Sequence, residues 1–111
     1  MASIGDSPSE RVFRTAAILS ASSLEWESGQ PARICQRGAF RRLDMPSFPP
    51  KDVEELLLSI MDDQERVTLA QTGQVGFVHV PDIGGSAWSV KVVKEPNWIR
   101  VEAHPVRGRE P

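Results

Sequence analysis

Cysteine and histidine are scarce in this chain, and tyrosine is absent. The one cysteine, Cys35, cannot form an internal disulfide, so a cytoplasmic location is expected. The two histidines, His79 and His104, lie far apart in the sequence, and together with a single cysteine they match no zinc-binding spacing. We therefore expect neither a metal nor any other cofactor.

Long apolar runs and an excess of basic charge are missing as well. No apolar segment approaches the roughly 18 residues that would predict a membrane span. The N-terminal MASIGDSPSE has neither the apolar run nor the basic flank of a signal peptide. The 13 basic residues are outnumbered by 15 acidic ones, which gives a net charge of −2. Because affinity for nucleic acid starts from a basic surface, a nucleic-acid partner is not expected.

Catalytic motifs are also lacking. The sequence contains no G-x-x-x-x-G-K-[ST] loop to cradle a triphosphate and no G-x-S-x-G nucleophile elbow. Nothing in the sequence places a base near Cys35, so we interpret it as a small, partly buried hydrophobe. His79 shares a strand face with Val75 and Phe77, and no carboxylate is placed by the sequence to pair with it, which is typical of a core or edge histidine. The sequence therefore predicts a protein that is not an enzyme.

The apolar residues that are present, 40% of the chain, predict one domain with a hydrophobic core. Residues 9–20 repeat apolar side chains at helical spacing, which predicts an amphipathic helix. A second helix is expected to begin at Pro50 and to bury one apolar stripe. The D-x-x-E pattern of Asp62 and Glu65 predicts a capping box that starts a third helix, and Gly73 would end it. The stripe of the second helix consists of Val53, Leu56, Leu57 and Ile60.

Alternating apolar and polar side chains predict strands over 23–28, 31–36, 39–43, 75–80, 86–95 and 98–103. Short turns, one of them at 81–85, join neighbouring strands, so the strands are expected to pair antiparallel. The predicted fold class is α+β, an antiparallel sheet of five to six strands with helices packed on one face. We expect the domain to span residues 9–105, between a disordered N-terminal tail (1–8) and a polar C-terminal tail (106–111).

The stretch DVEELLLSIMDDQERVTLAQTGQVGF, residues 52–77, resembles the N-terminal domain of the type IV pilus retraction ATPases, the PilT family. In that family a helix of the form P-x-D-x-E-E-L precedes a short D-x-x-R helix, a T/S-G pair and a strand. The resemblance continues upstream through ASSLEWESGQPARICQRGAF and downstream to His104-Pro105, so it covers about residues 10–105. It implies that the α+β domain is PAS-like. The matching positions are Ala21, Ser22, Leu24, Gly29, Pro31, Arg33, Gly38, Pro50, Asp52, Glu54, Glu55, Leu56, Asp63, Arg66, Thr72, Gly73, Phe77, Val90 and Val92.

Three departures from the family pattern separate this chain from a motor. The sequence ends where the family's ATPase domain would begin, so we interpret it as a stand-alone domain that lacks the ATPase domain. The family's R-F-R-V-N strand carries two arginines that belong to the nucleotide-facing side of a subunit boundary, and the aligned residues here are Ala87 and Ser89. The family's arginine before its final I-P is Glu102 here. The resemblance thus implies an accessory domain without the nucleotide-facing charges.

Three groups of residues are candidates for a partner interface. A cluster of arginines around Gly38 is either a solvated hairpin or a docking patch for an acidic surface. Two apolar residues that flank the helical stripe either widen the core or form a docking patch. A tryptophan after the Pro-Asn turn would anchor an interface if it is exposed. The candidate interface residues are Arg37, Arg41, Arg42, Leu58, Met61 and Trp98.

Two functions remain open. The first is a non-catalytic protein-interaction or regulatory module linked to type IV pilus twitching motility or to a related secretion motor. In the family that the sequence resembles, this domain packs against the ATPase domain of the adjacent subunit in a hexamer, which implies a hexameric ATPase or another motility protein as partner. The second is a PAS-like sensor that encloses a small ligand on the sheet face bearing Trp88, Val90 and Val92. A remnant of a motor protein that self-associates through a strand edge would show the same features.

Overall fold

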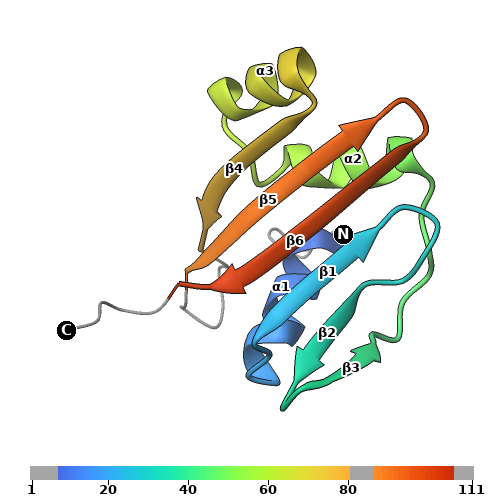
Figure 1. Ribbon diagram of the computed structural model, residues 1–111, viewed down its shortest axis with the longest axis vertical. Helices are drawn as coiled ribbons and strands as arrows, with labels where there is room; N and C mark the ends of the chain where they lie inside the picture. Colours follow the sequence, from blue (N-terminus) through green and yellow to red (C-terminus); the bar gives the residue numbers. More distant parts are fainter. Residues whose placement is uncertain (1–7, 81–86, 107–111) are drawn as a thin grey trace, which may run out of the picture.

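The computed structural model describes residues 8–80 and 87–106, which form a sheet with helices packed against it (Figure 1). The helices are α1 (Pro8–Ile18), α2 (Pro50–Leu58) and α3 (Asp63–Thr72). The strands are β1 (Ser23–Glu27), β2 (Arg33–Gln36), β3 (Ala39–Arg42), β4 (Gln74–His79), β5 (Trp88–Glu95) and β6 (Trp98–Pro105). Every predicted helix and strand is present. The predicted tails and the turn at 81–85 lie outside the described residues, apart from Pro8, where α1 begins, and Val106.

The sheet has six strands in the order β3-β2-β1-β6-β5-β4, and every neighbouring pair is antiparallel. Two sets of strands that follow each other in sequence, β1 to β3 and β4 to β6, are joined where β1 pairs with β6, with Trp26 opposite Val101. Figure 1 shows α1 and α2 behind the sheet and α3 beside β4. The predicted α+β class, an antiparallel sheet of up to six strands with helices packed against it, is confirmed.

Local signals explain where the two middle helices begin. Pro50 occupies the first turn of α2, where its missing N–H costs no hydrogen bond. At α3 the predicted capping box is present: the backbone N–H of Glu65 donates to the Asp62 carboxylate, and the backbone N–H of Asp62 donates to the Glu65 carboxylate. Gly73 ends α3 in the left-handed conformation, with φ 81°, as expected for this residue type.

Replacing Asp62 with alanine is expected to lower the free energy of unfolding by about 1 kcal/mol, because the first turn of α3 loses the side chain that accepts from Glu65. Urea denaturation measures this change. Asp63→Ala is the matched control, since the Asp63 carboxylate is fully exposed and lies 3.7 Å from Arg66, so its loss should cost clearly less than that of Asp62. Equal losses for both variants would contradict the capping role of Asp62.

The helix α2 buries less of its apolar stripe than the periodicity predicted. Val53 and Leu57 are fully buried, whereas Leu56 is only partly buried. Ile60 lies beyond the end of α2, in a turn where its backbone N–H donates to the Leu57 carbonyl. The same turn directs Met61 inward, where it is 4% exposed and part of the core. Its assignment to the candidate partner interface is therefore corrected: Met61 stabilises the fold and does not line an exposed surface.

The core fills the space between the helices and one face of the sheet. Trp26 and Trp88 are its largest fully buried side chains, and the Trp88 ring meets Phe13 of α1 edge to face, with centroids 5.9 Å apart. His79 lies in the same layer, is 9% exposed, and places Nε2 3.4 Å from a Glu10 carboxylate oxygen. The predicted core histidine is thus confirmed. The nearby carboxylate was not predicted, because α1 and β4 meet only in the folded chain.

Candidate functional site

One edge of the sheet is formed by a tight hairpin whose outer strand is open to solvent. A two-residue turn, Arg37 and Gly38, joins β2 to β3, and both residues have positive φ, 54° and 81°. This pair of φ values is that of a type I′ turn, which matches the twist of the flanking strands. All four residues of β3 are exposed, and β3 pairs with β2 alone in the described part of the sheet. The hairpin therefore presents a free strand edge.

The hairpin is also locally basic, although the chain as a whole is acidic. Residues 33–43 contain four arginines and no acidic residue. Arg33 is engaged: it donates to Glu25 at 2.6 and 2.9 Å, and its guanidinium carbon lies 4.7 Å from the centre of the Phe40 ring. The other three are Arg37, Arg41 and Arg42.

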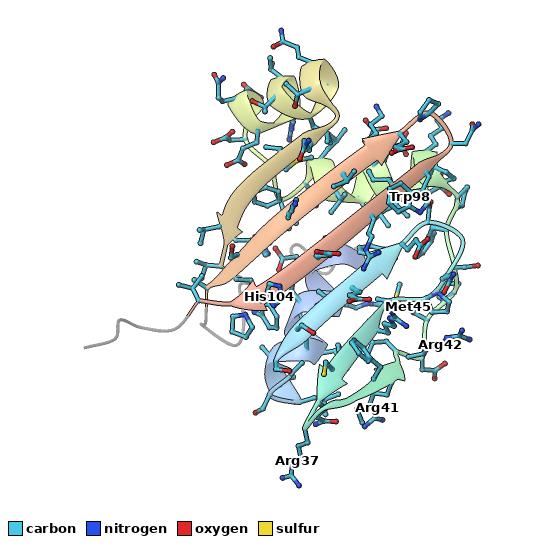
Figure 2. The ribbon with its side chains drawn as sticks, viewed as in Figure 1. Arg37, Arg41, Arg42, Met45, Trp98 and His104 are labelled. Carbon is cyan, nitrogen blue, oxygen red and sulfur yellow. The ribbon has the colours of Figure 1, made fainter. Side chains whose placement is uncertain are left out.

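These three arginines have no carboxylate within ion-pair distance among residues 8–80 and 87–106. Arg41 makes one long contact, 3.4 Å, to the side-chain amide of Gln36. Arg42 lies directly opposite Arg33 in the β2–β3 register, and because Glu25 already offsets the charge of Arg33, the charge of Arg42 is the one left without an anion. Figure 2 shows all three arginines at the same end of the sheet, with Arg37 extending beyond the turn. We call the surface formed by Arg37, Phe40, Arg41 and Arg42 the arginine edge.

The predicted interface residues do not form one surface. The three arginines lie together, but Trp98 lies at the other end of the sheet view, at the start of β6 (Figure 2). Its indole Nε1 donates to the Glu27 carboxylate at 2.8 Å, so the side chain is held against β1. Leu58 ends α2, packs partly against the core, and its carbonyl accepts from the Arg66 guanidinium. With Met61 buried, the arginine edge is the part of the predicted set that the fold brings together.

A second polar feature, on the face of the sheet away from α1 and α2, was missed by sequence reasoning. Glu25 on β1 receives Arg33 from β2 and Arg100 from β6, and Arg100 also contacts Glu102 at 2.9 Å. Glu25, Arg33 and Arg100, together with Glu27, border a small hollow of about 160 Å³. The cluster depends on the pairing of β1 with β6, which brings together residues from opposite ends of the sequence. Its charges neutralise one another, so it stabilises the join between the two halves of the sheet.

Replacing Glu25 with glutamine is expected to lower the free energy of unfolding by about 1 kcal/mol, because two arginines lose their shared, partly buried carboxylate. Chemical denaturation checks this value. Glu102→Gln is the matched control: it removes one contact to Arg100 at a more exposed site, and a change below about 0.5 kcal/mol is expected. If Glu102→Gln costs as much as Glu25→Gln, the central position assigned to Glu25 is wrong.

A larger hollow lies elsewhere, between α1 and the segment that follows β3. Its volume is about 520 Å³, within the usual range of small-molecule sites. It is lined by Arg11, Val12, Thr15, Leu43, Asp44, Met45, Pro46 and Phe48. The sheet face expected to line a ligand site is different: Trp88, Val90 and Val92 are at most 1% exposed and pack within the core. A ligand bound in this hollow would therefore contact α1 and the 43–48 segment.

Two observations concern the positions where nucleotide or metal contacts were considered. Ala87 and Ser89 stand where the resembled family has its two arginines, and Ser89 pairs with His104 on β6. Within residues 8–80 and 87–106, no group of three or more histidine, cysteine, aspartate or glutamate side chains is arranged to hold a metal ion. In the same part of the chain no helix is both long and apolar enough to cross a membrane.

Among the comparisons with known proteins, solved structures match this chain in fold. No protein-family model matches the sequence, and no curated protein does. The crystal structure of the pilus retraction motor PilT with bound ADP matches with a TM-score of 0.78 and 23% identity, over 92% of this chain and 30% of that one. The Legionella pneumophila ATPase DotB matches with a TM-score of 0.76 and 15% identity, over 93% of this chain and 29% of that one. This chain thus spans less than a third of either ATPase, and its fold is that of the N-terminal domain of these pilus and secretion ATPases.

Proposed function

We propose that this protein is a non-catalytic protein-interaction module that binds and regulates a motor ATPase of a type IV pilus or a related secretion system in the cytoplasm. The arginine edge is the observation that carries the proposal. It combines an open strand with three arginines that have no carboxylate partner in the described chain. Such a surface is suited to an acidic protein partner.

The fold supports a motor as that partner. In the family that the sequence resembles, the equivalent domain packs against the ATPase domain of the adjacent subunit in a hexamer. A separate domain of the same shape can occupy such a surface and change the rate at which the hexamer turns over. Ala87 and Ser89 replace the family's nucleotide-facing arginines, so we propose that this domain acts by docking and contributes nothing to phosphate chemistry.

Retention of a purified pilus retraction ATPase on the immobilised chain tests this proposal. We expect the ATPase to be retained, the ATPase rate to change when the free chain is added, and the chain alone to hydrolyse no ATP. A chain blocked at the arginine edge by Arg41→Glu and Arg42→Glu is the negative control. No retention of any pilus or secretion ATPase, or hydrolysis by the chain itself, would overturn the proposal.

A second candidate function is that of a small-ligand sensor, and the hollow of about 520 Å³ favours it. Its apolar lining and its two charged residues, Arg11 and Asp44, have the composition of a ligand site. A fragment library can be screened by thermal unfolding. A fragment that binds the folded state in the hollow should raise the melting temperature. Thr15→Phe, which fills the hollow from α1, is the control. Shifts that persist in Thr15→Phe, or no shifts at all, would remove this function.

A further inference from the structure

One hydrogen bond just beyond the end of β3 shows which backbone groups of β3 are not bonded to β2. Leu43 donates its N–H to the Ala32 carbonyl at 2.8 Å, so residues 43 and 32 form a hydrogen-bonded pair of the β2–β3 ladder. In an antiparallel ladder, hydrogen-bonded and non-hydrogen-bonded pairs alternate. Arg41 is therefore bonded to β2, whereas the N–H and C=O groups of Phe40 and Arg42 point away from it. These are the groups that another strand can use.

We propose that the β3 edge accepts an extended, acidic segment of the protein partner as a seventh strand of the sheet. This inference rests on the proposed function, since it names how the partner docks and what its docking segment contains. An added strand would bond to the free backbone groups of Phe40 and Arg42, and its side chains would meet the arginines. Backbone bonds would supply affinity, and charge would supply selectivity.

The charges fit two adjacent acidic residues in the incoming strand. Successive side chains of a strand point to opposite faces of the sheet. The register places Arg42 opposite Arg33, on the outer face with Glu25, and places Arg41 opposite Ile34, on the face that carries the helices. A neighbouring strand therefore meets one arginine on each face, and a pair of consecutive carboxylates satisfies both.

Neither a second copy of this chain at the β3 edge nor docking at the opposite edge of the sheet fits the charges as well. A second copy of β3 would bring arginines against arginines, and like charges directly opposite destabilise a strand pair. The opposite edge of the sheet, β4, has α3 beside it (Figure 1). Val78 on β4 and Val80 just after it are 63% and 57% exposed, and neither carries a charge that would select an acidic segment. Charge complementarity therefore favours an acidic segment from a different protein, docked at β3.

Binding of synthetic peptides to the full chain tests the inference without any ATPase. The probe is a fluorescein-labelled peptide of alternating valine and threonine with two central glutamates, followed by fluorescence polarisation. We expect it to bind, to slow hydrogen exchange at the amides of Phe40 and Arg42, and to lose at least tenfold in affinity for Arg41→Glu/Arg42→Glu. A peptide with lysines in place of the glutamates should lose at least as much.

A version of the probe with every backbone nitrogen methylated keeps its charge and loses its donors, and it separates strand pairing from charge attraction on the unaltered protein. We expect at least a tenfold loss of affinity. Three results would overturn the addition of an acidic partner strand at β3. These are equal binding of the methylated or the lysine peptide, exchange protection away from β3, and dimers of the chain formed through β3. Because no ATPase is present, a chain that pairs with the peptide but retains no motor would overturn the proposed function alone.

Discussion

Replacing Trp26 with alanine is expected to lower the free energy of unfolding by about 3–5 kcal/mol. Trp26 is fully buried on β1, the strand whose pairing with β6 joins the two halves of the sheet. Its ring also meets Phe48 edge to face, with centroids 6.3 Å apart, so it holds the segment between β3 and α2 against the sheet. Small domains are stable by only about 5–15 kcal/mol, so this variant should be close to unfolding at 25 °C.

The matched control is Trp26→Phe. The indole Nε1 of Trp26 is buried and has no hydrogen-bond partner among the described residues, so phenylalanine removes an unsatisfied donor while keeping most of the apolar surface. We expect a loss of about 1 kcal/mol or less, measured by urea denaturation of both variants. A loss below about 1 kcal/mol for Trp26→Ala would contradict the central place given to this side chain.

The double substitution Arg41→Glu/Arg42→Glu is expected to weaken binding of the partner ATPase about a hundredfold, a change of about 2.7 kcal/mol. It turns two attractive charges into repulsive ones at the docking edge, while the fold should tolerate it because both side chains are exposed. The free energy of unfolding should change by less than about 0.5 kcal/mol. Titration calorimetry measures the binding constant, and added salt should weaken the wild-type interaction more than that of the variant.

Lys51→Glu/Lys91→Glu is the control for net charge. It makes the same total change in charge at two exposed positions, one on α2 and one on the outer face of β5. We expect less than a threefold change in affinity, since neither residue lies on the hairpin. Similar losses for both double variants would mean that the overall charge of the chain, and not the arginine edge, controls binding.

Patterns confined to one segment predicted the fold well. The capping box at Asp62, the stop at Gly73 and the alternation along each strand depend on residues that are close in sequence, so they are readable without the structure. The β1–β6 pairing was not predicted, because its two strands come from opposite ends of the chain and are brought together only by the shared core. The length of α2 was also misjudged, since Ser59 ends it one residue before the last member of the apolar stripe.

The features of the candidate site were likewise predictable where they lie in one segment and unpredictable where they join distant segments. The arginine edge was predictable because one hairpin contains all of its residues. Glu25 with Arg100, and His79 with Glu10, were not, since each pair joins elements distant in sequence. Of the two alternatives for Met61, a wider core or a docking patch, the structure shows the first; the sequence could not decide between them because a turn after α2 sets which side chains face inward.

Hydrogen–deuterium exchange of the chain, with and without a purified pilus retraction ATPase, tests most directly the claim that the arginine edge is the functional surface. We predict that the ATPase slows exchange in residues 37–42 and leaves the outer faces of β5 and β6 unchanged. Slower exchange centred on β5 and β6, with residues 37–42 unaffected, would contradict the account.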